Sequence, residues 1–274
     1  MLKMSDITIT SLETITAFDV VTGAYKFTLD ELQDATIQNT QDKQDITGKG
    51  GRKLSSIKRN KAVTISGNNG LLSGGLLELQ TGSEFENKAT SVMWTDYLTV
   101  SSNEATGSYV AIGTTGAEII ELYIKNANGT LGDSLVQDST ASAGKFAYNP
   151  STKKFTFSGL DDGTEVIAYY NRNITADVLN NESDVFSGKA TLYIDAIGED
   201  KCANIYRVQF FIPKADFNGE FEISMGDNQV VHAFEAESLA GSCGNGSKLW
   251  SLTIFGENAA DTPVTGATGA TGTT

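Results

Sequence analysis

The sequence predicts an all-β fold with one flanking helix, and three observations support this prediction. The composition is globular, with 28 Gly, 3 Pro and 39% hydrophobic residues in a chain of 274. Its mixture of Gly, Thr, Ser and aromatic residues is typical of strands and turns. Apolar and polar residues alternate with a period of two in several stretches, and turn-forming residues separate them. The spacing indicates roughly eight or more short strands.

Strands are expected at several places along the chain. In residues 62–66, 206–212 and 250–254, every second residue is apolar, so each strand would have one apolar face. These faces contain Val63 and Ile65; Tyr206, Val208, Phe210 and Ile212; and Trp250, Leu252 and Ile254. The middle of the chain adds a hairpin, 145–148 with 154–157, and a strand over 166–170. Turns are expected at 128–129, 149–151, 161–163, 218–219 and 226–228.

One segment, residues 71–80, has helical rather than strand periodicity. Its apolar residues lie three and four positions apart and would share one helical face, formed by Leu72, Leu76 and Leu79. Asn69 or Ser73 can cap the start of this helix, and Gly82 can end it. Two glycines near its start each lower helix propensity by roughly 1 kcal/mol relative to Ala. The helix is therefore expected to depend on packing against the sheet.

The domain organisation is expected to be one β domain followed by a tail. The domain would cover residues 1–256, with its core in 1–99 and 191–256. The region 101–175 is either an inserted β-rich part or additional strands of the same sheet, because both produce the same alternation. Residues 257–274 are expected to form a flexible tail. Its end, 263–274, contains Thr, Gly and Ala in a three-residue period with Gly266, Gly269 and Gly272, but three triplets without proline cannot sustain a collagen helix.

Composition also excludes several functional classes. The chain has 34 acidic and 20 basic residues and a net charge of −14, which argues against a general nucleic-acid surface and against an anionic membrane. A catalytic triad would depend on His232, the one histidine, and Cys202 and Cys243 have no metal-ligand spacing. We therefore assign no catalytic, cofactor-binding or metal-binding residue and expect no disulfide framework, signal peptide or membrane span.

The basic residues are concentrated in one stretch, 43–61, which has a local charge of +6 and leaves −20 for the remainder. The cluster consists of Lys43, Lys49, Arg52, Lys53, Lys58, Arg59 and Lys61. A solvated loop is one interpretation. Nucleic-acid binding is another, but no aromatic residue between Phe27 and Phe85 can stack on a base. The third is a projecting arm that binds the acidic body of another copy, a heterologous contact that builds rings or filaments.

The order of these segments resembles the major tail tube proteins of long-tailed, siphovirus-type bacteriophages. The resemblance lies in GKGGRKL (48–54), IKRNKAVTISG (57–67) and the leucine-rich segment ending LELQTG (77–82). It continues in YRVQFFIPKA (206–215), FEAESLAG (234–241) and KLWSLTIFG (248–256). The similarity covers about 1–99 and 191–256, and it is a pattern of strands and spacing rather than a catalytic signature.

This resemblance implies a structural virion protein and no enzyme. Such proteins form a β-sandwich or half-barrel flanked by a helix, join into hexameric rings whose sheets form a continuous barrel, and stack into a tube. A long loop, here about 33–59, commonly reaches the neighbouring ring. The implied partners are other copies of the chain, other tail proteins, and DNA that passes through an acidic lumen without binding. Assembly would occur in the bacterial cytoplasm.

Two other classes remain open at the sequence level. A capsid decoration or other head-surface protein would accommodate the middle region and the Gly-Ala-Thr tail. A carbohydrate-binding module could stack sugars on aromatic side chains, for which the candidates are Trp94, Tyr169, Tyr170 and Trp250, although aromatic residues in strands more often belong to the core. Paired carboxylates such as Asp161 with Asp162 do not show the separation that glycosidases require.

Overall fold

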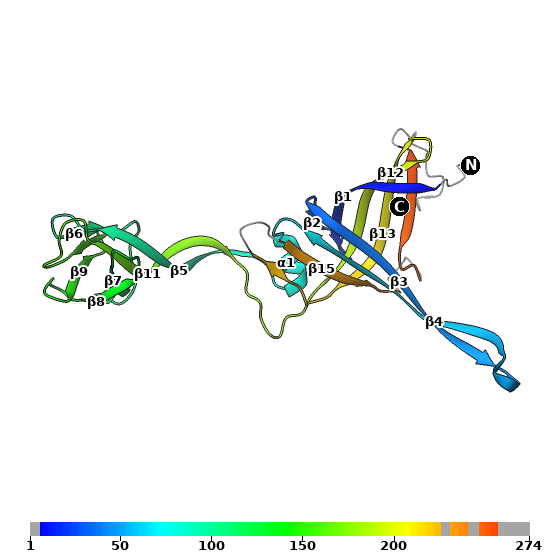
Figure 1. Cartoon of the computed structure of the whole chain (residues 1–274), viewed down its shortest axis with the longest axis horizontal. Coiled ribbons are helices and arrows are strands. Elements are labelled where there is room, and N and C mark those ends of the chain that lie inside the picture. The colour runs from blue at the N-terminus through cyan, green and yellow to red at the C-terminus, as the bar shows by residue number, and fades with distance from the viewer. Residues whose placement is uncertain (1–5, 226–230, 241–246, 257–274) are drawn as a thin grey trace, which may run out of the picture. The chain divides into compact units, whose positions relative to one another are not determined.

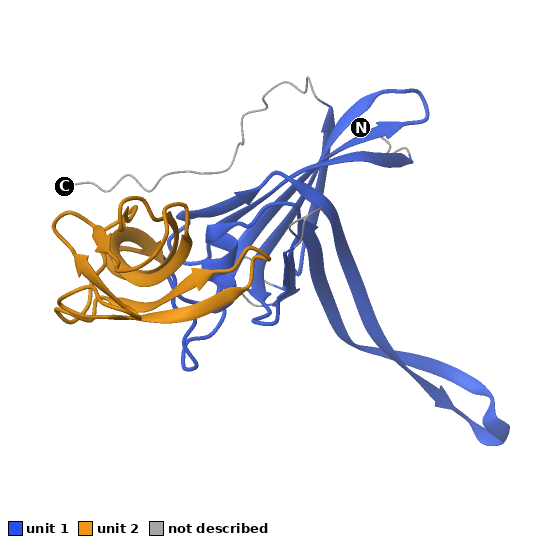
Figure 2. Cartoon of the chain, turned by 60° about the vertical axis from the view of Figure 1, so that its left-hand side comes forward, with its two compact units in different colours: residues 1–85, 179–274 blue, residues 86–178 orange. Residues whose placement is uncertain are grey.

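The computed structural model describes residues 6–225, 231–240 and 247–256. The chain divides into two compact units (Figure 2): the first contains residues 1–85 and 179–274, and the second contains 86–178. Both units are built from strands, and one α-helix lies in the described part (Figure 1). The predicted all-β fold with a flanking helix is therefore confirmed. The predicted turn at 226–228, the tail at 257–274 and Cys243 lie outside the described residues.

The first unit is built on a curled half-barrel sheet. Its strands follow the order β2-β1-β12-β13-β15-β4-β3, while β14 pairs with β15 and β16 pairs with β13. All of these pairings are antiparallel. The strands are β1 (Ile7–Asp19), β2 (Tyr25–Leu29), β3 (Leu32–Thr47), β4 (Lys53–Asn69), β12 (Lys189–Asp200), β13 (Ile205–Phe217), β14 (Ile223–Ser224), β15 (Val231–Ser238) and β16 (Ser251–Gly256).

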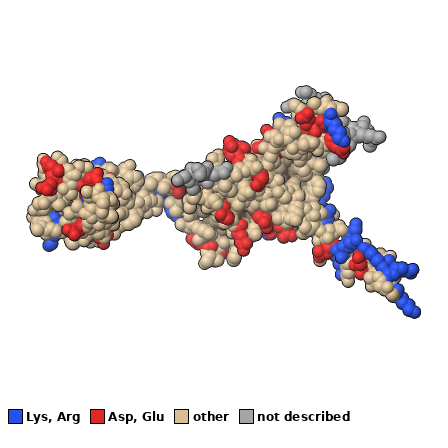
Figure 3. Space-filling model, in the orientation of Figure 1, with Lys and Arg blue, Asp and Glu red and all other residues tan. Residues whose placement is uncertain are grey.

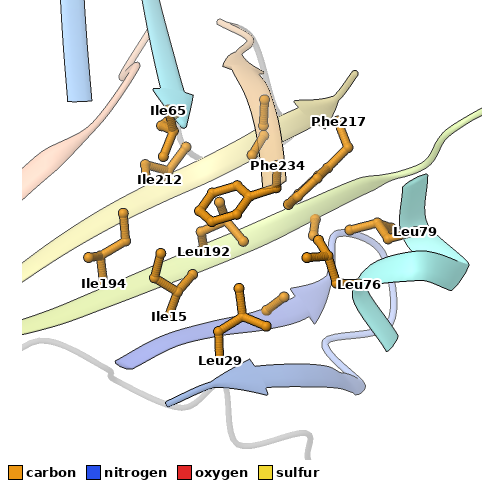
Figure 4. Packing of buried hydrophobic residues seen from close by; sticks show 14 of the residues in the cluster. Ile15, Leu29, Ile65, Leu76, Leu79, Leu192, Ile194, Ile212, Phe217 and Phe234 are labelled. Atoms are coloured by element: carbon orange, nitrogen blue, oxygen red, sulfur yellow. The ribbon is translucent and has the colours of Figure 1, made fainter. Parts of the chain in front are cut away.

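One face of this sheet carries the core of the first unit. Alternate residues of β1, β4, β12, β13 and β15 point to this face, as the period-two pattern predicted. Figure 4 shows these side chains meeting each other and the helix α1. The buried cluster includes Ile15, Leu29, Ile65, Leu192, Ile194, Ile212, Phe217 and Phe234. The opposite face of the sheet is consequently free to carry polar residues.

The helix α1 spans Gly74–Thr81 and confirms the predicted helix in shortened form. The Ser73 hydroxyl accepts a hydrogen bond from the Leu76 N–H, and Gly82 ends the helix in the left-handed conformation that glycine favours. Leu76 and Leu79 are buried against the sheet (Figure 4). The placement of Leu72 on the helical face was wrong, because Leu72 precedes the N-cap and is 56% exposed.

The second unit contains a seven-stranded sheet in the order β5-β11-β7-β8-β9-β10-β6. Its strands are β5 (Glu86–Thr99), β6 (Glu104–Thr106), β7 (Ile119–Lys125), β8 (Leu131–Gln137), β9 (Lys145–Asn149), β10 (Lys154–Thr156) and β11 (Glu165–Val178). The predicted hairpin is the antiparallel pair β9 and β10. The unit begins at Glu86, ahead of the expected position near 101, because β5 pairs with β11 along its whole length.

A buried hydrogen-bond network stabilises the core of the second unit. The Tyr170 hydroxyl donates to Asp96 Oδ2 at 2.8 Å and accepts from the Tyr109 N–H at 3.2 Å. Asp96 also accepts from the backbone N–H and the hydroxyl of Ser108, at 2.7 and 2.8 Å. Burial and the nearby Asp96 carboxylate raise the pKa of Tyr170, so its hydroxyl remains a proton donor.

Tyr170→Phe is expected to lower the free energy of unfolding of the second unit by roughly 1–3 kcal/mol, because the Tyr109 N–H loses its acceptor and Asp96 loses a donor. Denaturant unfolding followed through the fluorescence of Trp94, which lies in this unit, measures the change. Tyr169→Phe is the matched control, since Tyr169 points to the opposite face of the same strand. Equal stability of Tyr170→Phe and the wild type would contradict the assignment.

Candidate assembly surfaces

All seven basic residues of the predicted arm lie on one projecting hairpin, formed by β3 and β4. β15 pairs with β4 only over Thr64–Asn69, so β3 and β4 continue beyond the sheet with no partner except each other among the described residues. We call residues 41–61 of this hairpin the arm. A bulge between Thr40 and Asp42, with Asn60 at φ 49°, marks the place where the arm leaves the sheet.

The arm is a paired hairpin rather than the loop that the resemblance implied for 33–59. Strand pairing continues to Thr47 opposite Lys53, and the connection is a short 3₁₀ turn, Lys49–Gly51. Gly50 and Gly51 occupy positive φ angles of 79° and 77°, which explains glycine at the tip. The loop prediction was wrong because glycine-rich sequence accounts only for the tip, while the flanking residues pair as strands.

Cations dominate the arm. Lys43 lies directly opposite Lys58, and the described arm residues are almost all exposed. The Asp45 carboxylate is 2.7 Å from Lys53 Nζ and 4.0 Å from Lys43 Nζ. Hydrogen bonding to Asp45 raises the pKa of Lys53, which keeps this amine protonated. Figure 3 shows Lys and Arg gathered on the arm, whereas Asp and Glu are spread over the rest of the first unit in that view.

The polar face of the first unit's sheet is a second extended surface. Residues opposite each other in register share a face, so Thr36, Ser66 and Glu235 form one row across three strands. Asp195 and Gln209 form another pair, joined by a hydrogen bond of 2.8 Å. The carboxylates of this face include Asp34, Asp195, Glu199, Asp216, Glu235 and Glu237, and its cations include Lys189, Lys214 and Arg207. These residues could not be predicted from the sequence, because their common face depends on strand register.

The two ends of this polar face differ in chemistry. Near β3 and β4, a hollow of about 620 Å³ is lined by four carboxylates together with polar residues and with Phe221, Ala233 and Phe234; the carboxylates belong to Asp34, Glu220, Glu222 and Glu235. Near β1 and β2, aromatic side chains meet edge to face, with Phe18 and Tyr193 ring centroids 5.7 Å apart. The acidic end and the aromatic end therefore lie at opposite edges of one sheet.

His232 is part of the packing between helix and sheet. Its ring is fully buried, with Nε2 2.7 Å from Gln80 Oε1 and with the Ser73 N–H donating to Nδ1 at 3.3 Å. Because Nδ1 is an acceptor here, Nε2 carries the proton and donates to Gln80. Burial lowers the pKa of His232. His232 therefore lies on β15 with Gln80 and Ser73 as its hydrogen-bond partners.

The buried His232 predicts a loss of stability in acid. The unfolded chain takes up a proton near pH 6.5, whereas the folded chain resists protonation to a lower pH. This contribution is thus present above about pH 6.5 and is lost as the pH falls toward the folded pKa. Between about pH 7.5 and 5.5, we expect the wild type to lose more unfolding free energy than His232→Gln, as measured by denaturant unfolding. Parallel losses would contradict this account.

The aromatic candidates for sugar stacking serve mainly as packing residues. Tyr170 is fully buried, and Trp250 packs against Phe210 with ring centroids 5.9 Å apart. The Arg172 guanidinium lies 4.9 Å from the Trp94 ring centroid and 3.4 Å from that of Tyr109. This stack covers one side of each ring. Such an arrangement is typical of structural cation–π packing.

Within the described ranges, the structure contains no group of three or more His, Cys, Asp or Glu residues that could hold a metal ion. The same ranges contain no helix long and apolar enough to cross a membrane. Both surfaces described above are instead broad, polar and built on strands.

Comparison with known proteins identifies the family of this chain. A model of the YomU/Tube protein family matches residues 7–249, nearly the whole chain. The chain belongs to the YomU/Tube protein family. The family name supports a structural protein of the phage tail tube, a virion component and not a class of enzyme. A search of curated proteins found no match.

Proposed function

We propose that the chain is the tail tube subunit of a long-tailed, siphovirus-type phage, and that hexameric rings of it stack into a tube for DNA ejection. The observation that carries this proposal is the sheet of the first unit. One face is covered by its core and α1, the other is polar, and the outer strands β2 and β3 end the sheet within the described residues. A ring of such sheets encloses a polar channel.

Ring closure follows from the two edges of the sheet. An edge strand presents backbone N–H and C=O groups that can pair with another chain. When β2 of one copy pairs with β3 of the next, the contact is heterologous, and a suitable rotation closes it into a ring. The number of copies in the ring, six, comes from the resemblance to tail tube proteins. The acidic hollow of one copy would then lie beside the aromatic cluster around Phe18 of its neighbour.

The polar face would line the channel. Its carboxylates outnumber its cations, and Lys189 is neutralised by Asp216 at 2.8 Å. Neutral Thr, Ser, Asn and Gln side chains fill much of the remaining face. DNA phosphates meet like charge on such a wall and find no cluster of cations, so DNA passes through without binding.

The arm would connect successive rings. It extends beyond the sheet and carries the charge opposite to that of the remaining chain, so the arm of one ring is attracted to the acidic body of the next. The partners are thus other copies of the chain, together with other tail proteins at the tube ends. Assembly in the host cytoplasm would precede incorporation into the virion.

Negative-stain microscopy of the purified chain at increasing concentration tests the proposal. We expect rings first and then tubes with a central channel. Circular dichroism and the unfolding transition establish that the sample is folded. A folded chain that stays monomeric at all concentrations, without rings or tubes, would contradict the proposed function.

A further inference from the structure

The arm has two faces of different chemistry. Between Asp42 and Ile46, β3 pairs with Ser55–Arg59 of β4 without irregularity, so opposite residues share a face. One face contains Lys43, Asp45, Ser56 and Lys58. The other contains Asp42, Gln44, Ile46, Ser55, Ile57 and Arg59. The first face is cationic, and the second is neutral with two aliphatic side chains.

The two isoleucines form a small apolar patch on the neutral face. Ile46 lies opposite Ser55, and Ile57 lies opposite Gln44, which makes the isoleucines diagonal neighbours. Ile46 is 42% exposed and Ile57 is 38% exposed. Removing such aliphatic surface from water is favourable, whereas the opposed Lys43 and Lys58 are well solvated where they are. The neutral face therefore gains more than the cationic face from close packing.

A matching apolar hollow lies on the core face of the first unit's sheet. It has a volume of about 520 Å³ and is lined by Ile7 and Ile9 of β1, Val208 and Phe210 of β13, Leu252 and Ile254 of β16, and Asp6. Ile9 remains 52% exposed. The register places Ile7 and Ile9 at the start of β1, whereas α1 packs near Phe27, which pairs with Ala17 toward the end of β1. The helix thus leaves this end of the core face open.

We propose that Ile46 and Ile57 of one copy pack into this hollow of a second copy. This inference rests on the proposed function and specifies the chemistry of the arm contact. The paired strands hold the arm extended from the sheet (Figure 1), so the arm does not fold back onto its own chain. Asp6, the charged residue of the lining, is already paired with Lys201 at 2.6 Å, so the attraction between copies comes from the surplus of cations on the arm and of carboxylates on the rest of the chain. Because arm and hollow are different surfaces, the contact is head-to-tail and propagates from copy to copy.

In this placement the two faces of the arm contribute differently to assembly: the cationic face through long-range attraction and the neutral face through packing. The lysines of the cationic face attract the acidic body over a distance and are screened by salt, so they affect mainly the rate of encounter. The isoleucines act only on contact and are insensitive to salt. Assembly of the wild type should therefore slow with salt, while the assembled contact persists through its apolar part.

Cysteine cross-linking between copies tests the contact directly. In a background of Cys202→Ser and Cys243→Ser, one batch carries Ile57→Cys and another carries Leu252→Cys. After the batches are mixed and oxidised under assembly conditions, we expect a disulfide-linked dimer that contains one chain of each batch. Ser56→Cys and Thr253→Cys are the matched controls, because each points to the opposite face of its strand. These controls should give much less dimer.

A pair of double variants measures the strength of the contact. Ile46→Ser with Ile57→Ser should raise the concentration for half-assembly about tenfold or more. Lys43→Gln with Lys58→Gln should slow assembly and weaken its salt dependence, with a smaller change in that concentration. If wild-type tubes form but the Ser double variant assembles equally well, or cross-linking does not exceed the controls, the inference is wrong while the proposed function stands. If the folded wild type forms no assembly, both are wrong.

Discussion

Replacing Arg52, Lys53 and Lys58 by Glu is expected to abolish the stacking of rings into tubes. The reversal turns the cationic arm into an acidic one, which then meets an acidic body. The circular-dichroism spectrum should not change, because all three residues are exposed and lie beyond the sheet core. Negative-stain microscopy and light scattering measure the extent of assembly. Wild-type assembly should also slow as the salt concentration rises.

A charge-matched control distinguishes an effect of the arm residues from an effect of the net charge of the chain. Lys88, Lys145 and Lys154 lie in the second unit, and each forms an exposed ion pair of the kind that contributes little to stability. Their replacement by Glu changes the net charge of the chain by the same amount. We expect this control to form tubes. Tubes from the arm variant, or equal loss in both variants, would show that the arm has no specific role in stacking.

Leu76→Ala is expected to lower the free energy of unfolding of the first unit by about 3 kcal/mol. Leu76 is fully buried between α1 and the sheet (Figure 4), and such truncations lose transfer free energy and leave a cavity. Alanine itself favours the helix, so the loss reflects packing. Denaturant unfolding monitored by circular dichroism measures the change.

Leu72→Ala is the control for this prediction. Leu72 is an equally large side chain in the same segment, but it precedes the helix and is 56% exposed. Its truncation should change the free energy of unfolding by less than about 0.5 kcal/mol. Similar effects of the two substitutions would show that α1 is not anchored through Leu76.

Local signals in the sequence were sufficient to predict the helix and its caps, but not the residue at which it begins. Ser73 and Gly82 act through their own backbone and side chain, so their capping roles could be predicted. Leu72 has the correct spacing for the helical face. It lies outside the helix because Ser73 is the N-cap and the helix begins at Gly74, two residues after Leu72, and periodicity does not detect the position of a cap.

For the arm, the charge could be predicted from the sequence, but the strand pairing could not. Charge could be counted along the chain, which identified the seven basic residues as a unit. Pairing of β3 with β4 over the arm could not be predicted, because it depends on partners separated by the turn at Lys49–Gly51. The two faces follow only from that register. Consequently the sequence does not show that Ile46 and Ile57 share a face, although both are β-branched residues that favour strands.

The polar face required the most structural information. Asp195, Asp216 and Glu235 lie far apart in sequence, and only the strand order brings them onto one surface. The net charge of −14 indicated a surplus of carboxylates without locating any of them. Likewise, strand alternation in the middle of the chain did not reveal that β5 pairs with β11 from Glu86 onward, which sets the start of the second unit.

A cryo-electron microscopy reconstruction of the assembled chain would show which strands join neighbouring copies and which face of the sheet lines the channel. We expect stacked rings in which the sheet of the first unit continues from copy to copy through β2 and β3. Asp195, Glu235 and Glu237 should face the channel, and the arm should contact the adjacent ring. A reconstruction with the polar face turned outward, or with the copies of a ring joined through other strands, would show that the sheet does not form the channel as proposed.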